Sequence, residues 1–202
     1  MALAQRDAQE SDITVLCDIF FNAFANDLVM KQCFPDVPDV RAFWENILKK
    51  GMADPKCHTR CVVDTALPGS PVIAYSRWVD CDKDAPPPEG PQYPSGGNVE
   101  VSKIFFPQLR KKRMEIMKGR EYWYLGLLCC SPSHQGRGAG RMLLEYGLGL
   151  VDKEGKEAYV EASPPGAPVY KKFGFKEVDK VVMFDGQFTE LLMLRDGKQT
   201  TA

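Results

Sequence analysis

Residues 127–144 read LLCCSPSHQGRGAGRMLL, an apolar segment that leads through a glycine-rich loop into a helical pattern. Three glycines alternate with other residues from Gly136 to Gly140, so backbone N–H groups in this loop can approach a ligand closely. A helix N-terminus directly after the loop adds partial positive charge and unsatisfied donors. The stretch therefore predicts a site for an anion such as a diphosphate.

Two familiar phosphate-binding patterns do not fit this loop. The spacing of Gly136, Gly138 and Gly140 differs from the GxGxxG of dinucleotide-binding folds, and the preceding chain is not a series of βα units. The Gly-Lys-Ser/Thr ending of a P-loop is also missing. A turn without a ligand is the remaining alternative. A turn needs only one or two glycines, so three at a helix start favour close approach to a ligand.

Length and composition indicate one soluble globular domain. The chain has 202 residues, of which 44% are hydrophobic and 26% charged, with a formal net charge of −1. This charge balance argues against nucleic acid or an anionic membrane as a partner. No apolar run approaches the roughly 20 residues that span a bilayer, and residues 1–12 lack the pattern of a signal peptide. We expect a cytoplasmic monomer or homodimer, with one domain over 1–202 and a core over about 3–195.

The cysteines and histidines argue against disulfides and against a metal. The 7 cysteines are an odd number without framework spacing, and Cys129 and Cys130 are neighbours in an apolar segment. This pattern favours reduced thiols in an intracellular protein. With His58 and His134 as the only histidines, and with no CxxC or HExxH, no zinc site is expected.

Hydrophobic spacing and turn residues predict the helices and strands. We expect strands over 2–6, 59–64, 72–79, 121–130, 158–162, 175–184 and 188–194, and helices over 12–26, 40–51, 99–120, 138–153 and 168–173. The helix over 99–120 is expected to be interrupted at Pro107, and residues 81–97 to form a proline-rich surface loop. The basic run from Arg110 to Arg113 is predicted to be a solvated helix face, with attraction of a cofactor phosphate as the alternative.

The glycine-rich loop and a second motif together carry a family resemblance. The loop resembles motif A of the GNAT superfamily of acyl-CoA-dependent N-acyltransferases through the pattern Leu128-x-Cys130-x-Pro132-x-x-Gln135-Gly136-x-Gly138-x-Gly140. Residues 159–163 and 169–175, which read YVEAS and VYKKFGF, are similar to motif B of that family. The expected order of strands and helices also agrees, so the resemblance covers nearly the whole chain.

The resemblance implies a fold of class α/β (α+β), a single domain whose central mixed, mostly antiparallel sheet is splayed at the central strand and flanked by helices. It also implies acetyl-CoA as co-substrate, with main-chain groups of Leu128, Cys129 and Cys130 binding the pantetheine arm. The N–H of Leu128 would also polarise the thioester carbonyl. The remaining cofactor contacts that the resemblance implies are the loop N–H groups of Gly136, Arg137, Gly138, Ala139 and Gly140, the nearby Arg141, Gln135 as a brace, and Ser163 in place of a family asparagine.

The resemblance also implies catalytic roles. Tyr170 matches the family tyrosine near the sulfur of coenzyme A and would act as general acid, because a phenol of pKa about 10 is protonated at neutral pH; a tyrosine packed in the core is the alternative. Tyr124 replaces the glutamate of histone-acetylating relatives, so that route to deprotonation is missing. Glu161 is the candidate for amine contact or for a base acting through water, with a loop anchor as its alternative. Glu100 and Glu121 are weaker options.

Aromatic residues are frequent in the segments expected to meet the acceptor, which are the first two helices, the proline-rich loop and the segment before the central strand. Most aromatics at helical spacing are core residues. Trp123 and Tyr124 point to opposite faces of one strand, so one of the two would line the acceptor pocket. The other aromatics in these regions are Phe20, Phe24, Phe34, Trp44, Trp78, Phe105 and Phe106. They favour a small, partly apolar amine over a basic protein tail, which would need an acidic groove.

We therefore predict an N-acetyltransferase that moves an acetyl group from acetyl-CoA to the primary amine of a small molecule by direct attack in a ternary complex. Such a protein resembles the metabolite- or antibiotic-acetylating GNAT proteins of fungi and bacteria. Two alternatives stay open: a protein or peptide acetyltransferase, and a catalytically silent acyl-CoA-binding sensor. Tyr170 and the intact glycine loop argue against the sensor, which has no need of a proton donor.

Overall fold

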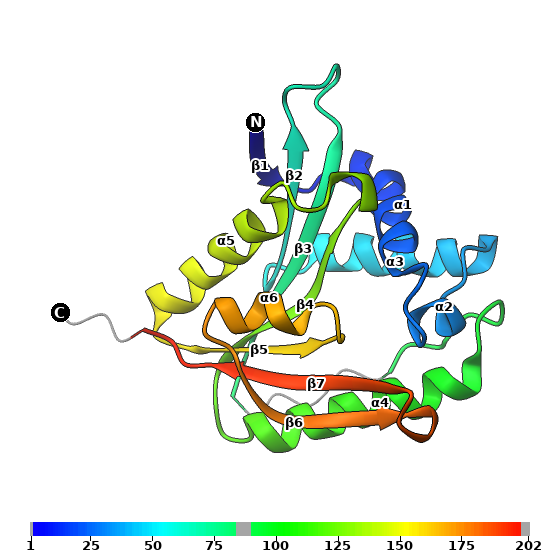
Figure 1. Cartoon of the computed structure of the whole chain (residues 1–202), viewed down its shortest axis with the longest axis vertical. Coiled ribbons are helices and arrows are strands. Elements are labelled where there is room, and N and C mark those ends of the chain that lie inside the picture. Colours follow the sequence, from blue (N-terminus) through cyan, green and yellow to red (C-terminus); the bar gives the residue numbers. More distant parts are fainter. Residues whose placement is uncertain (1, 84–89, 199–202) are drawn as a thin grey trace.

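Seven strands form one mixed sheet in the computed structural model, which describes residues 2–83 and 90–198 (Figure 1). The strands are β1 (Leu3–Asp7), β2 (Cys57–Asp64), β3 (Val72–Cys81), β4 (Tyr122–Cys130), β5 (Glu157–Ala162), β6 (Lys176–Met183) and β7 (Phe188–Arg195). Their order across the sheet is β1-β2-β3-β4-β5-β7-β6. Neighbouring strands run antiparallel except β4 and β5, which are parallel. The predicted mixed, mostly antiparallel sheet is confirmed.

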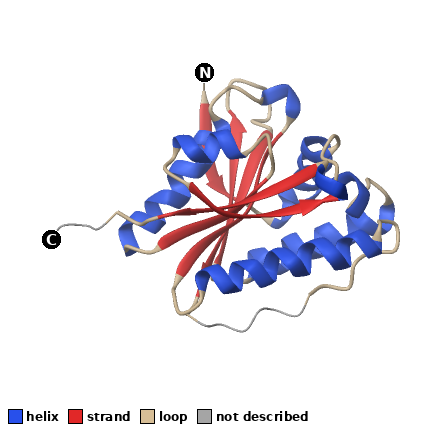
Figure 2. Cartoon of the chain, turned by 60° about the horizontal axis from the view of Figure 1, so that its bottom comes forward, coloured by secondary structure: helices blue, strands red, loops and turns tan. Residues whose placement is uncertain are grey.

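Helices cover both faces of the sheet (Figure 2). They are α1 (Ile13–Phe24), α2 (Met30–Cys33), α3 (Pro38–Ala53), α4 (Val99–Met117), α5 (Ala139–Glu154) and α6 (Ala167–Lys172). The first four contribute to the larger apolar core on one face. On the other face, α5 and α6 pack over the middle strands and form two smaller apolar clusters.

Two local predictions about the helices do not match the structure. Helix α4 continues through Pro107, so the predicted interruption is wrong. Pro107 and Lys103 are both exposed, so water can bond the Lys103 carbonyl, which loses its helical partner. The short helix α2 was not predicted. Asp27 starts it, because its Oδ1 accepts hydrogen bonds from the N–H groups of Val29 and Met30 at 3.0 and 2.8 Å. The predicted proline-rich loop over 81–97 lies partly outside the described residues.

The parallel pairing of β4 with β5 ends halfway along β4. Hydrogen-bonded register runs from Tyr122 opposite Glu157 to Leu125 opposite Val160 and stops there. At the next residue, Gly126, β4 carries a bulge relative to β3, since Trp78 faces Leu125 while Arg77 faces Leu127. A bulge bends its strand. The rest of β4 stays paired with β3 but leaves β5, which confirms the expected splay.

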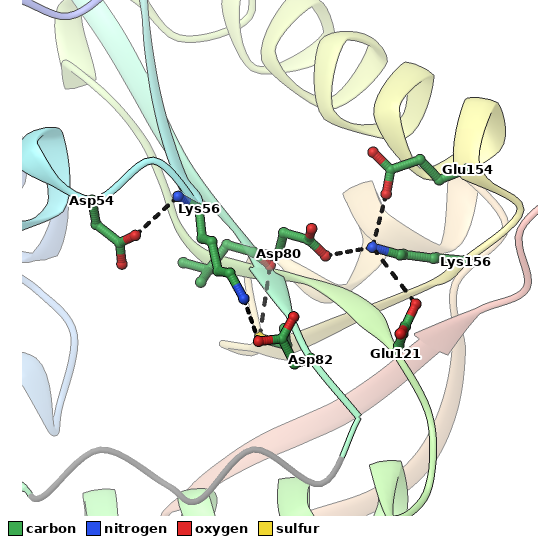
Figure 3. Close-up of polar contacts among 9 residues, drawn as sticks. Asp54, Lys56, Asp80, Asp82, Glu121, Glu154 and Lys156 are labelled. Atoms are coloured by element: carbon green, nitrogen blue, oxygen red, sulfur yellow. Dashed lines mark hydrogen bonds and ion pairs between the residues drawn. The ribbon is translucent and has the colours of Figure 1, made fainter.

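A cluster of charged residues ties the closed end of the splay (Figure 3). The ammonium of Lys156, just before β5, lies 2.7 Å from Oδ1 of Asp80 on β3 and 2.9 Å from Oε2 of Glu154 at the end of α5. Glu121, just before β4, lies 4.0 Å from the same nitrogen. Beside them, Lys56 pairs with Asp82. One partly buried cation thus links three strands and a helix at the end where β4 and β5 remain together.

Helix α5 packs closely against the sheet through a glycine. Gly147 is buried on the inner face of α5, and a Cβ added there would overlap the indole ring of Trp78. Trp78 is a fully buried residue of β3. The absence of a side chain at Gly147 therefore sets how near α5, and the glycine loop at its N-terminus, lie to the sheet.

Replacing Gly147 by alanine should lower the free energy of unfolding by about 1–3 kcal/mol, because an overpacked core must shift, although alanine favours a helix by about 1 kcal/mol over glycine. The control is Gly149→Ala in the same helix. Gly149 is exposed and an added Cβ meets nothing within 4 Å, so that variant should be more stable than the parent. Urea unfolding of both variants measures the difference, and equal stabilisation by the two would contradict the close contact.

Candidate active site

A cavity of about 460 Å³ lies where β4 and β5 separate. Residues 125–128 of β4 line one side and the end of β5 lines the other. Its polar and ionisable side chains come from six helices and strands and from two loops: Arg77, Tyr93, Arg110, Arg113, Tyr124, Glu161, Ser163, Tyr170 and Glu190. The splay thus opens into a cavity, partly open to solvent, that contains both charged and apolar groups.

The wall opposite the splay is apolar and mostly aromatic. It is formed by residues of α1 to α4 and the segments between them: Phe24, Met30, Phe34, Phe43, Trp44, Ile47, Phe105, Phe106 and Leu109. The rings pack on one another, with Phe34 and Phe43 stacked at 5.6 Å between centroids and Phe34 and Phe106 at 5.4 Å. Of the aromatics singled out in the sequence, Phe20 and Trp78 are buried in the two cores and are not among the lining residues.

Tyr124, and not Trp123, faces the cavity. Tyr124 is among its lining residues. Trp123, 2% exposed, lies on the opposite face of β4, where its ring contacts His58 at 5.2 Å between centroids and its Nε1 donates to Glu154 at 3.1 Å. The assignment of Trp123 as a substrate contact is therefore corrected, because the alternation of β4 turns it away.

Glu161 is held by two neighbours at the cavity. The hydroxyl of Tyr124 donates to its Oε2 at 2.5 Å, and Nη1 of Arg113 donates to its Oε1 at 3.2 Å. The guanidinium of Arg113 also stacks over the Tyr124 ring at 3.9 Å. Burial, followed by the charge of Glu161, raises the pKa of Tyr124 far above its ordinary value, so the phenol remains protonated. Both oxygens of Glu161 are thus occupied in this arrangement.

The basic run of residues 110–113 is not simply a solvated face. The Arg113 side chain is only 15% exposed and is paired with Glu161, so that prediction is wrong for this residue. Lys112 pairs with Asp179 of β6 at 2.5 Å. Arg110 lines the cavity. Four adjacent cationic side chains predicted an exposed helix face, because cations are rarely buried. Arg113 can be buried since the carboxylate of Glu161 compensates its charge.

Tyr170 lies on α6 and lines the cavity from the end of β5. It is 7% exposed, and its ring contacts Phe175 at 5.8 Å between centroids. Burial raises the pKa of the Tyr170 phenol, and the nearby charge of Glu190 raises it further. The hydroxyl is therefore protonated at any working pH, as a proton donor requires.

Glu190 of β7 is a site residue that the sequence reasoning missed. It is 9% exposed and lines the cavity. Burial, and then the charges of Glu161 and Asp27, raise its pKa well above the usual range of a carboxyl. In the sequence it sits between Thr189 and Leu191 of an alternating strand, and a charged residue at an inward position of that strand is the signal that could have identified it.

The glycine loop has open space in front of its backbone. Gly136 and Gly138 have φ of +74° and +95°, and a Cβ added at either one or at Gly140 meets nothing within 4 Å. Gly138 is the N-cap of α5 and has no side chain to occupy the first N–H groups of the helix. These donors are free for an anion. Gln135 donates to the carbonyl of Cys130 at 3.4 Å, in keeping with its expected role as a brace.

The two arginines of the loop have protein partners. Nη2 of Arg137 donates to Oδ2 of Asp64, at the end of β2, at 2.6 Å, and the Asp64 side chain is 1% exposed. Arg141 pairs with Glu145 one turn later and is largely exposed. In this structure the side chain of Arg137 therefore anchors the loop to β2, while that of Arg141 lies at the surface.

The other residues expected to contact the cofactor lie along the open part of β4 and at the end of β5. Leu128 and Ser163 line the cavity. The Cys129 side chain is buried in the larger core, and Cys130 is half-buried with its thiol near the Ser131 carbonyl at 3.5 Å. Beyond Leu125 the backbone of β4 has no hydrogen-bonded register with β5. Main-chain groups, rather than these cysteine side chains, are what β4 presents to the opening. Ala139 is buried at the first position of α5.

The weaker base candidates lie elsewhere. Glu100, in the first turn of α4, is 82% exposed and 3.6 Å from Lys103, and Glu121 belongs to the Lys156 cluster.

Within residues 2–83 and 90–198, no three His, Cys, Asp or Glu side chains are grouped as metal ligands would be. Within the same ranges, each helix is too short or too polar to cross a membrane.

Comparisons with known proteins agree with this geometry. A model of the acetyltransferase (GNAT) domain matches residues 113–189. An uncharacterized N-acetyltransferase of Schizosaccharomyces pombe is 35% identical over 74 residues, which are 35% of this chain and 30% of that relative. The solved structure of histone acetyltransferase HPA2 and related acetyltransferase from Corynebacterium glutamicum covers 100% of both chains, with 21% identity and a TM-score of 0.68. A mosquito arylalkylamine N-acetyltransferase like 5b covers 96% of this chain and 100% of its own, with 12% identity and a TM-score of 0.67.

Residues 113–189 thus match a GNAT acetyltransferase domain, in agreement with the resemblance carried by the two motifs. At these low identities the solved structures show a likeness of fold alone.

Proposed function

We propose that this protein transfers an acetyl group from acetyl-CoA to the primary amine of a small, largely apolar molecule. The observation that carries the proposal is one continuous cavity that joins the open edge of β4, the phenol of Tyr170 and an aromatic wall. An acyl donor entering along β4 and an amine entering along the wall would meet beside Tyr170.

The residues present fit coenzyme A as the carrier of the acetyl group. The diphosphate would lie against the N–H groups of residues 136–140, where the missing side chains leave room and the start of α5 favours negative charge. The pantetheine arm would bond the main chain of β4 at Leu128 to Cys130, on the edge that is not paired with β5. The thioester supplies an activated carbonyl carbon, and the N–H of Leu128 would polarise its oxygen. Arg137, Arg141 and Ser163 stay predictions as cofactor contacts.

Tyr170 would protonate the leaving sulfur. Its pKa is raised by burial, so the phenol carries its proton until a stronger base forms next to it. A thiolate released in an apolar site is such a base, because it lacks the solvation that stabilises it in water. The buried position of Tyr170 at the end of β5 thus suits a general acid.

The composition of the wall supports an apolar acceptor. A ring or alkyl group would contact Phe24, Phe34, Trp44 and Phe106, while its amine would face the carboxyl groups near the splay. The mosquito structure with the same fold is described as an arylalkylamine N-acetyltransferase-like protein, which agrees with this choice. The bacterial structure, described as a histone acetyltransferase, makes a peptide the alternative acceptor. A cytoplasmic location stays a prediction.

We expect a panel of three amines to separate these acceptors: 2-phenylethylamine, spermidine and a lysine-containing peptide. Burial of a phenyl group contributes about 1.5–3 kcal/mol, so kcat/KM for 2-phenylethylamine should exceed that for spermidine at least ~10-fold. Release of coenzyme A thiol measures the rate. Acetylation of the peptide alone would instead support a protein acetyltransferase. Binding of acetyl-CoA without turnover of any amine would contradict an enzyme.

Replacing Gly136 by alanine should weaken acetyl-CoA binding at least ~10-fold, because the new methyl group would stand where the diphosphate approaches. Gly69, in the turn between β2 and β3, provides a matched control. It has the same φ of +74° and also has nothing within 4 Å of an added Cβ. Gly69→Ala should therefore introduce the same backbone strain and leave the affinity for acetyl-CoA unchanged. Calorimetric titration of both variants measures the dissociation constants, and similar losses in the two would refute the loop as the diphosphate site.

Replacing Tyr170 by phenylalanine should lower kcat by ~100-fold, within the range of a lost general acid, and leave the dissociation constant of acetyl-CoA unchanged. Tyr146→Phe is the control, because the Tyr146 hydroxyl contacts His58 at 3.2 Å and lies outside the cavity lining. Steady-state kinetics and calorimetry measure the two quantities. Full turnover by the Tyr170 variant would exclude the phenol as proton donor.

A further inference from the structure

The cavity holds two carboxyl groups on one face of the sheet. In the register of β5 with β7, Glu161 faces Leu192 and Ala162 faces Leu191. Since side chains two residues apart share a face, Glu190 lies on the same face as Leu192 and as Glu161. The two glutamates are thus diagonal neighbours on adjacent strands. Both line the cavity at the splay.

These two carboxyl groups differ in their partners. The oxygens of Glu161 accept hydrogen bonds from Tyr124 and Arg113. Glu190, nine-tenths buried, has no hydrogen-bond or ion-pair partner among residues 2–83 and 90–198. A buried carboxylate without a partner is strongly unfavourable. Its position on the wall of a cavity indicates that a ligand supplies the missing donor.

The charges around Glu190 select the kind of ligand. Glu161 on β5 and Asp27 before α2 both add negative potential, and the Tyr170 phenol on α6 is neutral. Arg113, a cation beside these carboxyl groups, is bound to Glu161. A ligand group that brings positive charge and N–H donors would therefore be favoured there, and an ammonium has both.

We propose that Glu190 binds the amine of the acceptor and accepts its proton. This role rests on the acyl transfer proposed above. The protonated amine gives one proton to the Glu190 carboxylate, and the neutral nitrogen then attacks the thioester carbonyl carbon. The C–N bond forms, the C–S bond breaks and its electron pair stays on sulfur. The thiolate takes the proton of the Tyr170 hydroxyl. The acylated nitrogen, which still carries one proton more than the amide product, gives that proton to the Tyr170 phenolate. Glu190 releases to solvent the proton that it took from the amine.

In this assignment Glu161 is a positioning residue. It fixes Tyr124 and Arg113 at the mouth of the splay and contributes negative potential beside Glu190. The raised pKa of Glu190 suits its role, because a carboxylate whose pKa lies above its usual range is a stronger base than an ordinary carboxylate. The base that the sequence placed at Glu161 would thus lie one strand further out in the sheet.

The test is Glu190→Gln, which keeps the shape of the side chain and removes its basicity. With the fastest amine of the panel above, we expect kcat/KM at pH 7 to fall at least ~100-fold, with acetyl-CoA affinity unchanged. Because the variant must use amine that is already neutral, its log kcat/KM should rise with a slope of about 1 between pH 7 and 9. The parent should show a smaller slope. Glu177→Gln, on an exposed position of β6, should match the parent.

Stability supplies a readout that does not depend on the acceptor. A carboxyl whose pKa is raised by folding stabilises the fold while it is protonated, and this contribution is lost as the pH rises through the folded pKa. The Gln variant has no such loss. Its Tm should therefore exceed that of the parent at pH 8, and the difference should shrink at pH 5. A lower Tm at pH 8 would show that Glu190 has a stabilising partner and would overturn the proposal.

The outcomes separate this proposal from the one on which it rests. Turnover by the parent together with at least half that turnover in Glu190→Gln would overturn the role of Glu190 and leave the acetyltransferase intact. A parent that acetylates no amine of the panel would overturn the function itself, and the role of Glu190 with it. A large kinetic loss with the steeper pH dependence would support both.

Discussion

The arrangement of the site depends on where the pairing between β4 and β5 stops. The two strands are parallel partners only as far as Leu125 and Val160. Around Lys156 a set of carboxylates holds one end of this pair closed. At the other end the bulge at Gly126 turns β4 aside while β3 follows it. A ligand can bond to the backbone of β4 because no strand occupies that edge.

This constraint divides the molecule into two halves with different chemistry. On the side of α5, the glycine loop offers main-chain donors and open space. On the side of α1 to α4, the cavity wall is mostly aromatic, and α4 also contributes Arg110 and Arg113. Arg113 connects the halves, since α4 carries it to Glu161 on β5. Under the function proposed above, the donor half would recognise features shared by all acyl-coenzyme A molecules, and the acceptor half would provide selectivity.

Much of this architecture could be predicted from the sequence. The strands, the longer helices and the glycine loop follow from hydrophobic spacing and turn residues, which are local signals. The splay was expected only from the family resemblance, because no local sequence feature indicated it. The start of α2 depends on two hydrogen bonds to Asp27, and the continuation of α4 past Pro107 depends on solvent exposure. A sequence pattern resolves neither.

The candidate site was predicted less completely. Its backbone part could be proposed from the sequence, because the glycine spacing directly indicates an open loop before a helix. The side-chain part depends on contacts between residues far apart in the chain. Arg113 and Glu161 are 48 residues apart in the sequence, so no local pattern in the basic run indicated that they form a pair. Glu190 lies on a strand near the C-terminus, and only the register of β7 against β5 places it beside Glu161. Trp123 and Tyr124 could be separated only when the orientation of β4 was known.

The bond between Arg137 and Asp64 has a further consequence for how the loop meets its ligand. It joins the middle of the glycine loop to the end of β2, a strand on the far side of β3. A loop with three glycines would otherwise sample many shapes, and a ligand that selected one of them would bear that entropy loss at association. Here the bond between Arg137 and Asp64 already restricts the conformations of the loop when the chain folds. For the diphosphate that we propose there, the loop is thus preorganised, and binding would need no prior rearrangement of it.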